Sequence, residues 1–289
     1  PDYVILAAGA YEKGLPVPGW TLPGVMTTGA AQTLVRGNQV SPGQRVLVAG
    51  NGPLNLQVAA ELAASGAQVV SLVELADTRW LTNLRWGAAA YLAAHSLART
   101  GLAYLSTLRR RDVPVLDRSV VTRFEGDGRV ESVTTARLGR DGLPDDKTTE
   151  SHSVDAVCVG YGFLPSNTIA KAVGCLHSFD AELGYSVPVR TNTGLTSIEG
   201  VWVVGDSGGI SGAHVARHQG LLAGVDVVRH ATGNDACEPL GLRAARRALK
   251  RHERFQEAVR GIYSAPNFTH ELADDETVVC RCETVTLGE

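Results

Sequence analysis

The chain has 289 residues, of which 44% are hydrophobic and 20% charged, and it contains 32 glycines. This composition excludes a disordered chain, and the length favours two globular domains. A formal net charge of −3 without a long basic block argues against nucleic acid as a partner, and no apolar run is long enough to span a membrane.

The chain begins with Pro1 and its only methionine is Met26, so we expect a piece of a larger protein. The five cysteines are an odd number in a long chain, which argues against a secreted disulfide framework. No leader peptide is visible at the N-terminus. The cytoplasm is therefore the expected compartment.

The first residues predict a strand, a connector and a helix. The apolar run at residues 3–8 is typical of a strand and ends at Gly9. Residues 15–24 are rich in proline and glycine and predict an extended connector, because proline lacks the N–H that a sheet needs. Residues 28–37 then predict a short helix.

A βαβ unit follows. An apolar run at residues 45–49 predicts a buried strand, and residues 54–65 have the spacing of a helix that Gly66 would end. A second strand is expected at residues 68–75. A strand, a glycine turn, a helix and a strand within roughly 30 residues predict parallel strands with a right-handed crossover.

The rest of the chain alternates in the same way. Asp127 and Gly128 between two alternating runs are a strong signal for a β-hairpin. The further expected elements are a helix at 80–99, the hairpin at 120–137, a polar loop at 140–150, buried strands at 154–159 and 201–204, a helix at 212–230 and a helical connector up to residue 270.

The first candidate site is the turn after the strand at 45–49. Gly50 and Gly52 let the backbone approach a pyrophosphate, and the helix N-terminus attracts its charge. Glu74, at the end of the next strand, could accept the ribose hydroxyls of NAD and repel a 2′-phosphate. The alternative is a tight turn without a ligand and a solvated Glu74. Asn55 at the third glycine position and the nearby Arg79 leave the choice of nucleotide open.

The second candidate site is Gly205-Asp206, which follows an apolar strand and precedes a helix from Gly212. An aspartate at this place can hydrogen-bond a ribityl chain, and the helix N-terminus supports the electron-rich side of a flavin. The alternative is that Asp206 caps the helix or forms the turn.

The third candidate is the pair Cys280 and Cys282. Two thiolates this close can bind a metal or an iron–sulfur cluster, but they do not fill four ligand positions. The alternative is a surface pair of thiols. The sequence has no Cys-x-x-Cys pair, so dithiol exchange has no candidate.

Taken together, these motifs resemble the flavoproteins with two dinucleotide folds, and nearly the whole chain is covered. The branch they resemble includes one subunit type each of hydrogen cyanide synthase (the B type) and opine oxidase (the A type), dye-linked proline dehydrogenase subunits and the alpha chain of sarcosine oxidase. The segments that carry the resemblance are VILAAGAYEKGLPVPGWTLPGVMTTGAAQ from Val4, VLVAGNGPLNLQVAAELAASGAQV from Val46, DAVCVGYGFLPSN from Asp155, GVWVVGDSGGISGAHVARHQGLLAG from Gly200 and VVCRCETVT from Val278.

The resemblance implies an α/β fold of two Rossmann-like dinucleotide-binding domains, with three layers and a β-meander. An NAD(P)-binding domain at 41–156 would interrupt an FAD domain formed by 1–40 and 157–232. A helical connector at 233–273 and the start of a [2Fe–2S] module at 274–289 would follow. The family's first βαβ unit and the other two cluster cysteines would lie outside this chain.

The resemblance also implies roles for particular residues, although it names no catalytic acid or base. Cys280 and Cys282 would be two of four cluster ligands. The residues expected to bind FAD or a second nucleotide, NAD(P) or another adenine nucleotide, are Ala8, Gly9, Gly50, Asn51, Gly52, Pro53, Glu74, Gly160, Gly162, Gly205, Asp206, Gly212 and Ala213.

The expected function is that of one component of an FAD-dependent oxidoreductase, similar to the pyridine nucleotide-disulphide enzymes but without their redox disulphide. It would relay electrons during the oxidation of an amino acid or secondary amine, and its partner would be a second flavoprotein. Two alternatives stay open: a stand-alone NAD(P)H-dependent flavin reductase, and a non-catalytic nucleotide-binding subunit.

Overall fold

The computed structural model describes residues 2–79, 81–181, 183–233 and 241–289. The chain forms two compact units. The first, here called the sheet unit, contains Glu12–Ala88, His95–Gly162 and Val259–Glu289. The second unit contains Pro1–Tyr11, Ala89–Ala94 and Phe163–Ala258.

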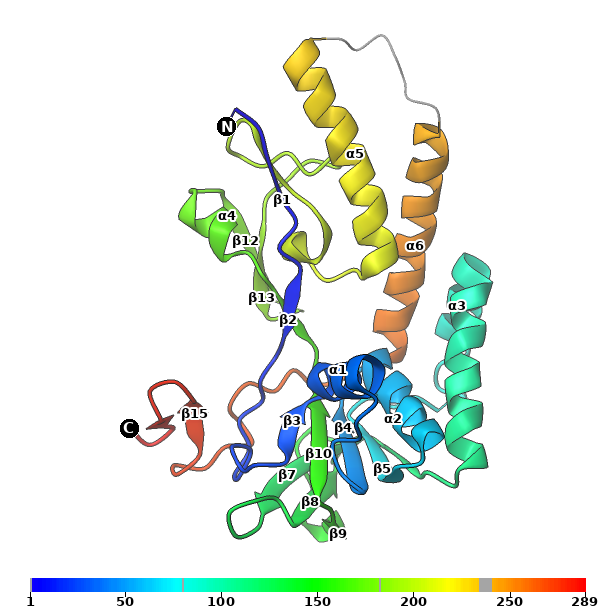
Figure 1. The fold of residues 1–289 in the computed structure, drawn as a ribbon, viewed down its shortest axis with the longest axis vertical. Coiled ribbons are helices and arrows are strands. Elements are labelled where there is room, and N and C mark those ends of the chain that lie inside the picture. The colour runs from blue at the N-terminus through cyan, green and yellow to red at the C-terminus, as the bar shows by residue number, and fades with distance from the viewer. Residues whose placement is uncertain (1, 80, 182, 234–240) are drawn as a thin grey trace. The chain divides into compact units, whose positions relative to one another are not determined.

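The sheet unit is built on a parallel sheet in the order β3-β10-β4-β5-β6, of which Figure 1 labels the first four strands. These strands are β3 (Val25–Thr27), β10 (Ala156–Gly160), β4 (Arg45–Gly50), β5 (Gln68–Glu74) and β6 (Val115–Asp117). The predicted βαβ unit is confirmed as β4, α2 (Pro53–Ser65) and β5, and Gly66 ends α2 with a φ of 99°. Gly50 is in register with both Gly160 and Glu74, so the three residues lie at one carboxyl edge.

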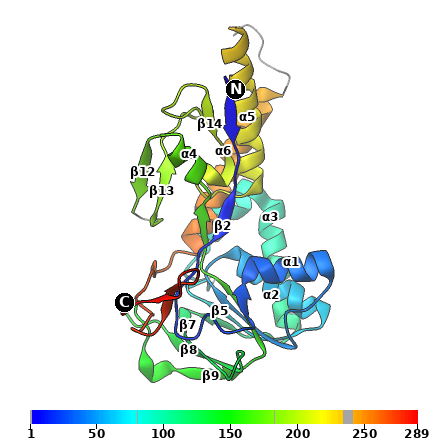
Figure 2. The ribbon, with the colours of Figure 1, turned by 60° about the vertical axis from the view of Figure 1, so that its left-hand side comes forward.

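The two faces of this sheet belong to different cores. Successive side chains of a strand point to opposite faces, so Val46 and Val48 of β4 pack with α2, whereas Leu47 and Ala49 pack with β7 and β8. The helices α1 (Thr28–Asn38) and α2 lie side by side on one face, as both views show (Figures 1 and 2). The expected α/β architecture of three layers is therefore confirmed for this unit.

The β-meander consists of β7 (Ser119–Glu125), β8 (Ser132–Arg137) and β9 (Glu150–Ser153). The predicted hairpin is confirmed by the antiparallel pairing of β7 and β8. The expected polar loop at 140–150 was wrong in part, because it contains the 3-10 turn η1 (Asp146–Thr148) and the start of β9. All four residues of β9 are polar and the strand lies at a sheet edge, so no apolar alternation marks it.

Two predicted boundaries differ from the structure. The helix expected at 80–99 is α3 (Leu84–Arg110), which begins later and has a kink where Ala94 has non-helical backbone angles. It continues beyond residue 99 because Leu108 is buried in the core beside α2. The strand expected from residue 154 begins two residues later, because the Asp155 carboxylate accepts the N–H groups of Gln44 and of Arg45, the first residue of β4. Trp80 lies outside the described residues.

In the second unit, β1 (Val4–Leu6) pairs in parallel with β14 (Val201–Val203), which confirms both predicted strands. The 3-10 turn η2 (Gly205–Gly208) follows β14 and leads to α5 (Ala213–Thr232). The other elements are β2 (Ala10–Glu12), β11 (Phe163–Pro165), α4 (Thr168–Ala172), β12 (His177–Asp180), β13 (Tyr185–Pro188) and α6 (Leu242–Ile262).

The last part of the chain returns to the sheet unit from Val259 onward. It ends in a small antiparallel pair, β15 (Val278–Cys280) and β16 (Val285–Thr286). Across the described ranges, none of the helices combines the length and the apolar character that crossing a membrane requires.

Candidate cofactor-binding sites

The glycine turn between β4 and α2 has the geometry of an anion-binding turn. Gly50 and Gly52 have φ values of 152° and 122°, which favour glycine. A Cβ atom on Gly50 would overlap the carbonyl of Gly160, whereas a Cβ atom on Gly52 would meet nothing within 4 Å. The N-terminus of α2 is therefore open above Gly52. Pro53 occupies its first position and offers no N–H.

Asn55 has a structural role at the third glycine position. Its side chain is buried, its Nδ2 donates to the carbonyl of Gly160 (2.7 Å) and its Oδ1 accepts the hydroxyl of Thr28 (2.8 Å). A Cβ atom on Gly160 would lie 2.7 Å from Thr28 Oγ1 and closer still to Asn55 Oδ1. In this chain the close approach that only a glycine allows is therefore made at residue 160, and residue 55 carries a side chain.

Glu74 is buried at the end of β5, so the alternative of a solvated strand end is wrong. Its Oε2 accepts the N–H of Gly52 (3.3 Å) and its Oε1 accepts the N–H of Ala76 (3.1 Å). Burial raises the pKa of Glu74 to about 8, against the opposing effect of these N–H groups and with a further rise from Asp117. Burial thus favours the protonated carboxyl, and a neutral acid would not repel a 2′-phosphate.

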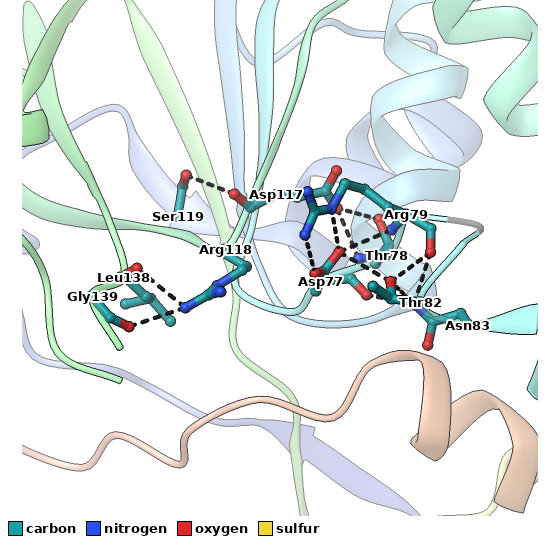
Figure 3. Close-up of polar contacts among 10 residues, drawn as sticks. All are labelled: Asp77, Thr78, Arg79, Thr82, Asn83, Asp117, Arg118, Ser119, Leu138 and Gly139. Carbon is teal, nitrogen blue, oxygen red and sulfur yellow. Dashed lines mark hydrogen bonds and ion pairs between the residues drawn. The ribbon is translucent and has the colours of Figure 1, made fainter. Parts of the chain in front are cut away.

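The residues that follow β5 and β6 form a network of hydrogen bonds with an ion pair between Asp77 and Arg79 (Figure 3). Asp77 accepts Arg79 through two bonds of 2.8 and 2.5 Å, and these hold the pKa of Asp77 down at about 2. Asp117, at the end of β6, accepts the N–H and the hydroxyl of Thr78. Arg118 reaches the carbonyl of Gly139 at 3.0 Å. A cavity of about 280 Å³ opens beside Asp117, Arg118 and Arg79. The guanidinium of Arg79 is therefore already paired and is not a free phosphate ligand.

In the second unit, the parallel pairing of β1 and β14 brings the two predicted flavin segments to one edge. The N–H of Val204 donates to the carbonyl of Leu6 (3.0 Å), so the Ala8-Gly9 and Gly205-Asp206 turns follow neighbouring strand ends. Gly9 has a φ of 71°, and a Cβ atom there would meet nothing within 4 Å.

Asp206 shapes the start of α5. Its Oδ1 accepts the N–H groups of Ser211 and Gly212, both at 2.8 Å. This is the turn-forming role that stood as the alternative to cofactor binding. The two roles are compatible, because Oδ2 makes no hydrogen bond within the described residues. Gly212 precedes Ala213, the first residue of α5, so the helix N-terminus lies beside the carboxylate. These groups fit a bound flavin.

Cys280 and Cys282 lie together in the C-terminal segment, with their Sγ atoms 3.9 Å apart. Thiolates about 2.3 Å from one tetrahedral metal would be roughly 3.8 Å apart, so the pair fits two ligands of one metal. The N–H of Glu283 and the neighbouring Cys282 lower the pKa of the Cys280 thiol, which favours the ligating thiolate. No cluster of three metal-ligating side chains occurs in the part of the chain that the structure describes.

The remaining cysteines do not join this pair. Cys158 and Cys175 are buried free thiols, and burial raises the pKa of Cys158 to about 12. Cys237 lies outside the described residues.

The last segment of the chain adds a group that sequence patterns did not single out. The carbonyl of Tyr263 accepts Nδ2 of Asn51 in the glycine turn (3.0 Å). Burial raises the pKa of the Tyr263 phenol far above its usual value, and the nearby carboxyls of Glu74 and Asp117 raise it further. Tyr263 is 212 residues from Asn51, and no local pattern connects them.

Comparison with known proteins agrees with this geometry. Residues 1–220 match the family model described as pyridine nucleotide-disulphide oxidoreductase. The HcnB component of hydrogen cyanide synthase from Pseudomonas aeruginosa is 30% identical over 289 residues, covering 100% of this chain and 61% of that protein. The A-type component of opine oxidase from Rhizobium meliloti is 32% identical over 292 residues, covering 99% of this chain and 60% of that protein.

The chain thus spans about three fifths of the length of these relatives. Among solved structures, L-proline dehydrogenase from P. horikoshii superposes with a TM-score of 0.57 at 18% identity, covering 99% of this chain and 44% of that one. At this identity the likeness shows a shared fold.

Proposed function

This chain belongs to the pyridine nucleotide-disulphide oxidoreductase family, and on that premise we propose that it is part of one component of an FAD-dependent oxidoreductase. That component relays electrons while an amino acid or secondary amine (opine, proline, sarcosine or glycine-like) is oxidised. The observation that carries the proposal is the edge of the second unit, where the Gly9 and Asp206 turns follow paired strands and the N-terminus of α5 begins.

In this proposal the residues of the second unit bind and orient the flavin. The free Oδ2 of Asp206 accepts hydroxyls of the ribityl chain, and the positive φ of Gly9 lets the backbone pass close to the cofactor. The N–H of Ala213 lies at the N-terminus of α5, where it supports negative charge, while the N–H of Gly212 is bonded to Asp206 Oδ1 and fixes the turn. The bound FAD supplies the two-electron redox chemistry, while the protein sets its position and electrostatics.

Cys280 and Cys282 are proposed to hold one iron of a [2Fe–2S] cluster. The support is their Sγ separation of 3.9 Å and the lowered pKa of Cys280. Such a cluster takes four thiolates, so two further ligands must come from elsewhere in the complete protein or its complex. The cluster would carry single electrons away from the flavin site.

The partner and the compartment are proposed from the relatives. The hydrogen cyanide synthase and opine oxidase relatives are both named as subunits of larger enzymes. We therefore expect a second flavoprotein, an oxidase or dehydrogenase that binds the amine, as partner, and a complex located in the cytoplasm. The glycine turn at Gly50–Gly52 favours an adenine nucleotide, NAD(P) included, as a second ligand.

The test uses the full-length protein purified with its co-expressed partner. We expect flavin absorbance, release of FAD on denaturation, and reduction of an artificial dye when an amine substrate is added. Asp206→Ala should lower the bound flavin, whereas the exposed control Lys171→Ala should not. A folded complex without flavin would refute the proposal. Dye reduction by NADH alone would instead favour a stand-alone flavin reductase, and nucleotide binding without any turnover would favour a non-catalytic subunit.

A further inference from the structure

The segment from Val259 to Phe268 lies against the glycine turn of the sheet unit. The carbonyl of Tyr263 accepts a hydrogen bond from Asn51. In addition, Gly261 at the end of α6 lies close to the indole ring of Trp86. A Cβ atom on Gly261 would lie 2.7 Å from Nε1 of Trp86 and closer still to other atoms of that ring. Only a glycine allows this approach, so the segment is closely fitted at this point.

The far end of the segment is anchored as well. Phe268 is 5% exposed and belongs to the core between the sheet and the meander. Lys13 Nζ donates to Oδ1 of Asn267 and to the carbonyl of Phe268, both at 2.6 Å. A segment that is anchored at Gly261 and at Phe268 holds Tyr263 in place between them. Residues 259–268 are called the strap below.

The strap lies where a nucleotide would need free groups. In a dinucleotide fold the acid after the second strand of the βαβ unit binds the adenine ribose. That acid is Glu74, which is buried and has both oxygens bonded to backbone N–H groups. The phenol of Tyr263 lies near Glu74 and Asp117. The Nδ2 of Asn51 donates to the strap, while its Oδ1 is buried without a hydrogen-bond partner among the described residues. The glycine turn therefore fits a pyrophosphate, but the carboxyl that would bind the ribose is buried, with Tyr263 near it.

We propose that the strap gates the second nucleotide fold, so that NADH and NADPH bind only when residues 259–268 move off Asn51 and Glu74. The inference rests on the proposed function, because it makes the amine rather than a reduced nicotinamide the source of electrons for the flavin. Tyr263 and Lys13 are positioning residues of this gate. They hold the strap closed and take no part in hydride transfer.

The test measures nucleotide binding to the full-length flavoprotein and its variants. NADH and NADPH are titrated by calorimetry, with tryptophan fluorescence as a second signal because Trp86 touches the strap. Flavin bleaching by each nucleotide is followed anaerobically by stopped flow. Tyr263→Ala removes the phenol near Glu74, and Lys13→Ala removes both bonds at the far anchor. Lys147→Ala is the matched control, because this lysine is exposed and its side chain makes no bond within the described residues.

Gating predicts weak binding to the parent protein and to Lys147→Ala. It predicts at least about tenfold tighter binding to Tyr263→Ala and Lys13→Ala, because a closed site lowers the apparent affinity by the fraction of molecules that are open. Amide hydrogen exchange of the strap should rise when NADH binds. Binding to the parent protein as tight as to both variants, or faster exchange without a gain in affinity, would overturn the gate.

If a variant does not fold, measurements on the parent protein alone still test the gate. Micromolar binding of NADH with rapid flavin bleaching, and with the strap protected from exchange, overturns the inference. Loss of the proposed function gives a different result, namely a folded protein that contains no flavin.

Discussion

The Gly160→Ala substitution tests how this chain manages without the third glycine of the nucleotide-binding turn. The new Cβ atom would lie 2.7 Å from Oγ1 and 3.1 Å from Cβ of Thr28, and would overlap Oδ1 of Asn55. Two buried hydrogen bonds, from Asn55 to Gly160 and from Thr28 to Asn55, would have to shift. At about 1 kcal/mol for each bond and about 1–3 kcal/mol for overpacking, the expected loss of stability is about 3–5 kcal/mol.

Chemical and thermal denaturation measure this loss. For a domain of 150–250 residues, about 2–4 °C per kcal/mol converts it to a fall in Tm of about 6–20 °C. Gly87→Ala is the matched control, because a Cβ atom on this helical residue would meet nothing within 4 Å. We expect that control to be neutral or stabilising by up to about 1 kcal/mol.

A double mutant shows whether Asn55 is the cause. Asn55→Gly restores the third glycine and removes the nearer of the two side chains that block a Cβ atom at residue 160. In that background Gly160→Ala should cost about 2 kcal/mol less than it does alone, a coupling typical of residues in contact. Strictly additive losses, or a Gly160→Ala protein within about 0.5 kcal/mol of the parent, would contradict the packing argument.

Three further predictions concern the candidate cofactor sites. The raised pKa of Glu74 makes its protonated form the stable one in the fold, so its contribution is complete below about pH 4.5 and is lost as the pH rises to about 8. Glu74→Gln should remove this loss, seen as a stability gain over the parent protein at pH 8 that is absent at pH 4.5, and equal pH profiles would contradict it. Asp206→Ala should lower the stability of the second unit by about 1–2 kcal/mol through the turn before α5, and Asp206→Asn should retain more flavin than Asp206→Ala does. Cys280→Ser and Cys282→Ser should each abolish the visible and paramagnetic signals of a cluster in the full-length protein while flavin stays bound, and unchanged signals would remove both residues as ligands.

The sequence predicted those parts of the fold that local patterns encode. The alternating and apolar runs of β4, β5, β7 and β8 and the glycine that ends α2 each depend on neighbouring residues, and the structure confirms them. β9 was missed because Glu150–Ser153 is polar and gains its hydrogen bonds from β8, an interaction set by the meander rather than by its own side chains. The kink at Ala94 has no glycine or proline to mark it.

Some features of the candidate sites could likewise be predicted from local sequence patterns, whereas others required the structure. The turn at Gly50–Gly52 could be found from spacing, because two glycines between a strand and a helix leave few other structures. The burial of Glu74 could not, since it depends on the strands on either side of β5 and on the N–H of Gly52. The role of Asn55 also needed the structure, because its partners Thr28 and Gly160 are 27 and 105 residues away.

The contacts of Asn55 and of the strap affect how the glycine turn of this chain can bind a nucleotide. In a working dinucleotide site, the turn and the acid after the second strand are both free to meet the ligand. Here Asn55 fixes the turn to β10, and the strap brings Tyr263 near Glu74, the acid after the second strand. Any nucleotide must displace contacts that are 212 residues apart in sequence, so its apparent affinity includes the free energy of opening the strap. The Asp206 turn has no such requirement, because its carboxylate keeps one oxygen without a partner within the described residues. The proposed gate therefore predicts that opening of the strap limits nucleotide binding at the glycine turn, whereas flavin binding at the Asp206 turn does not depend on it.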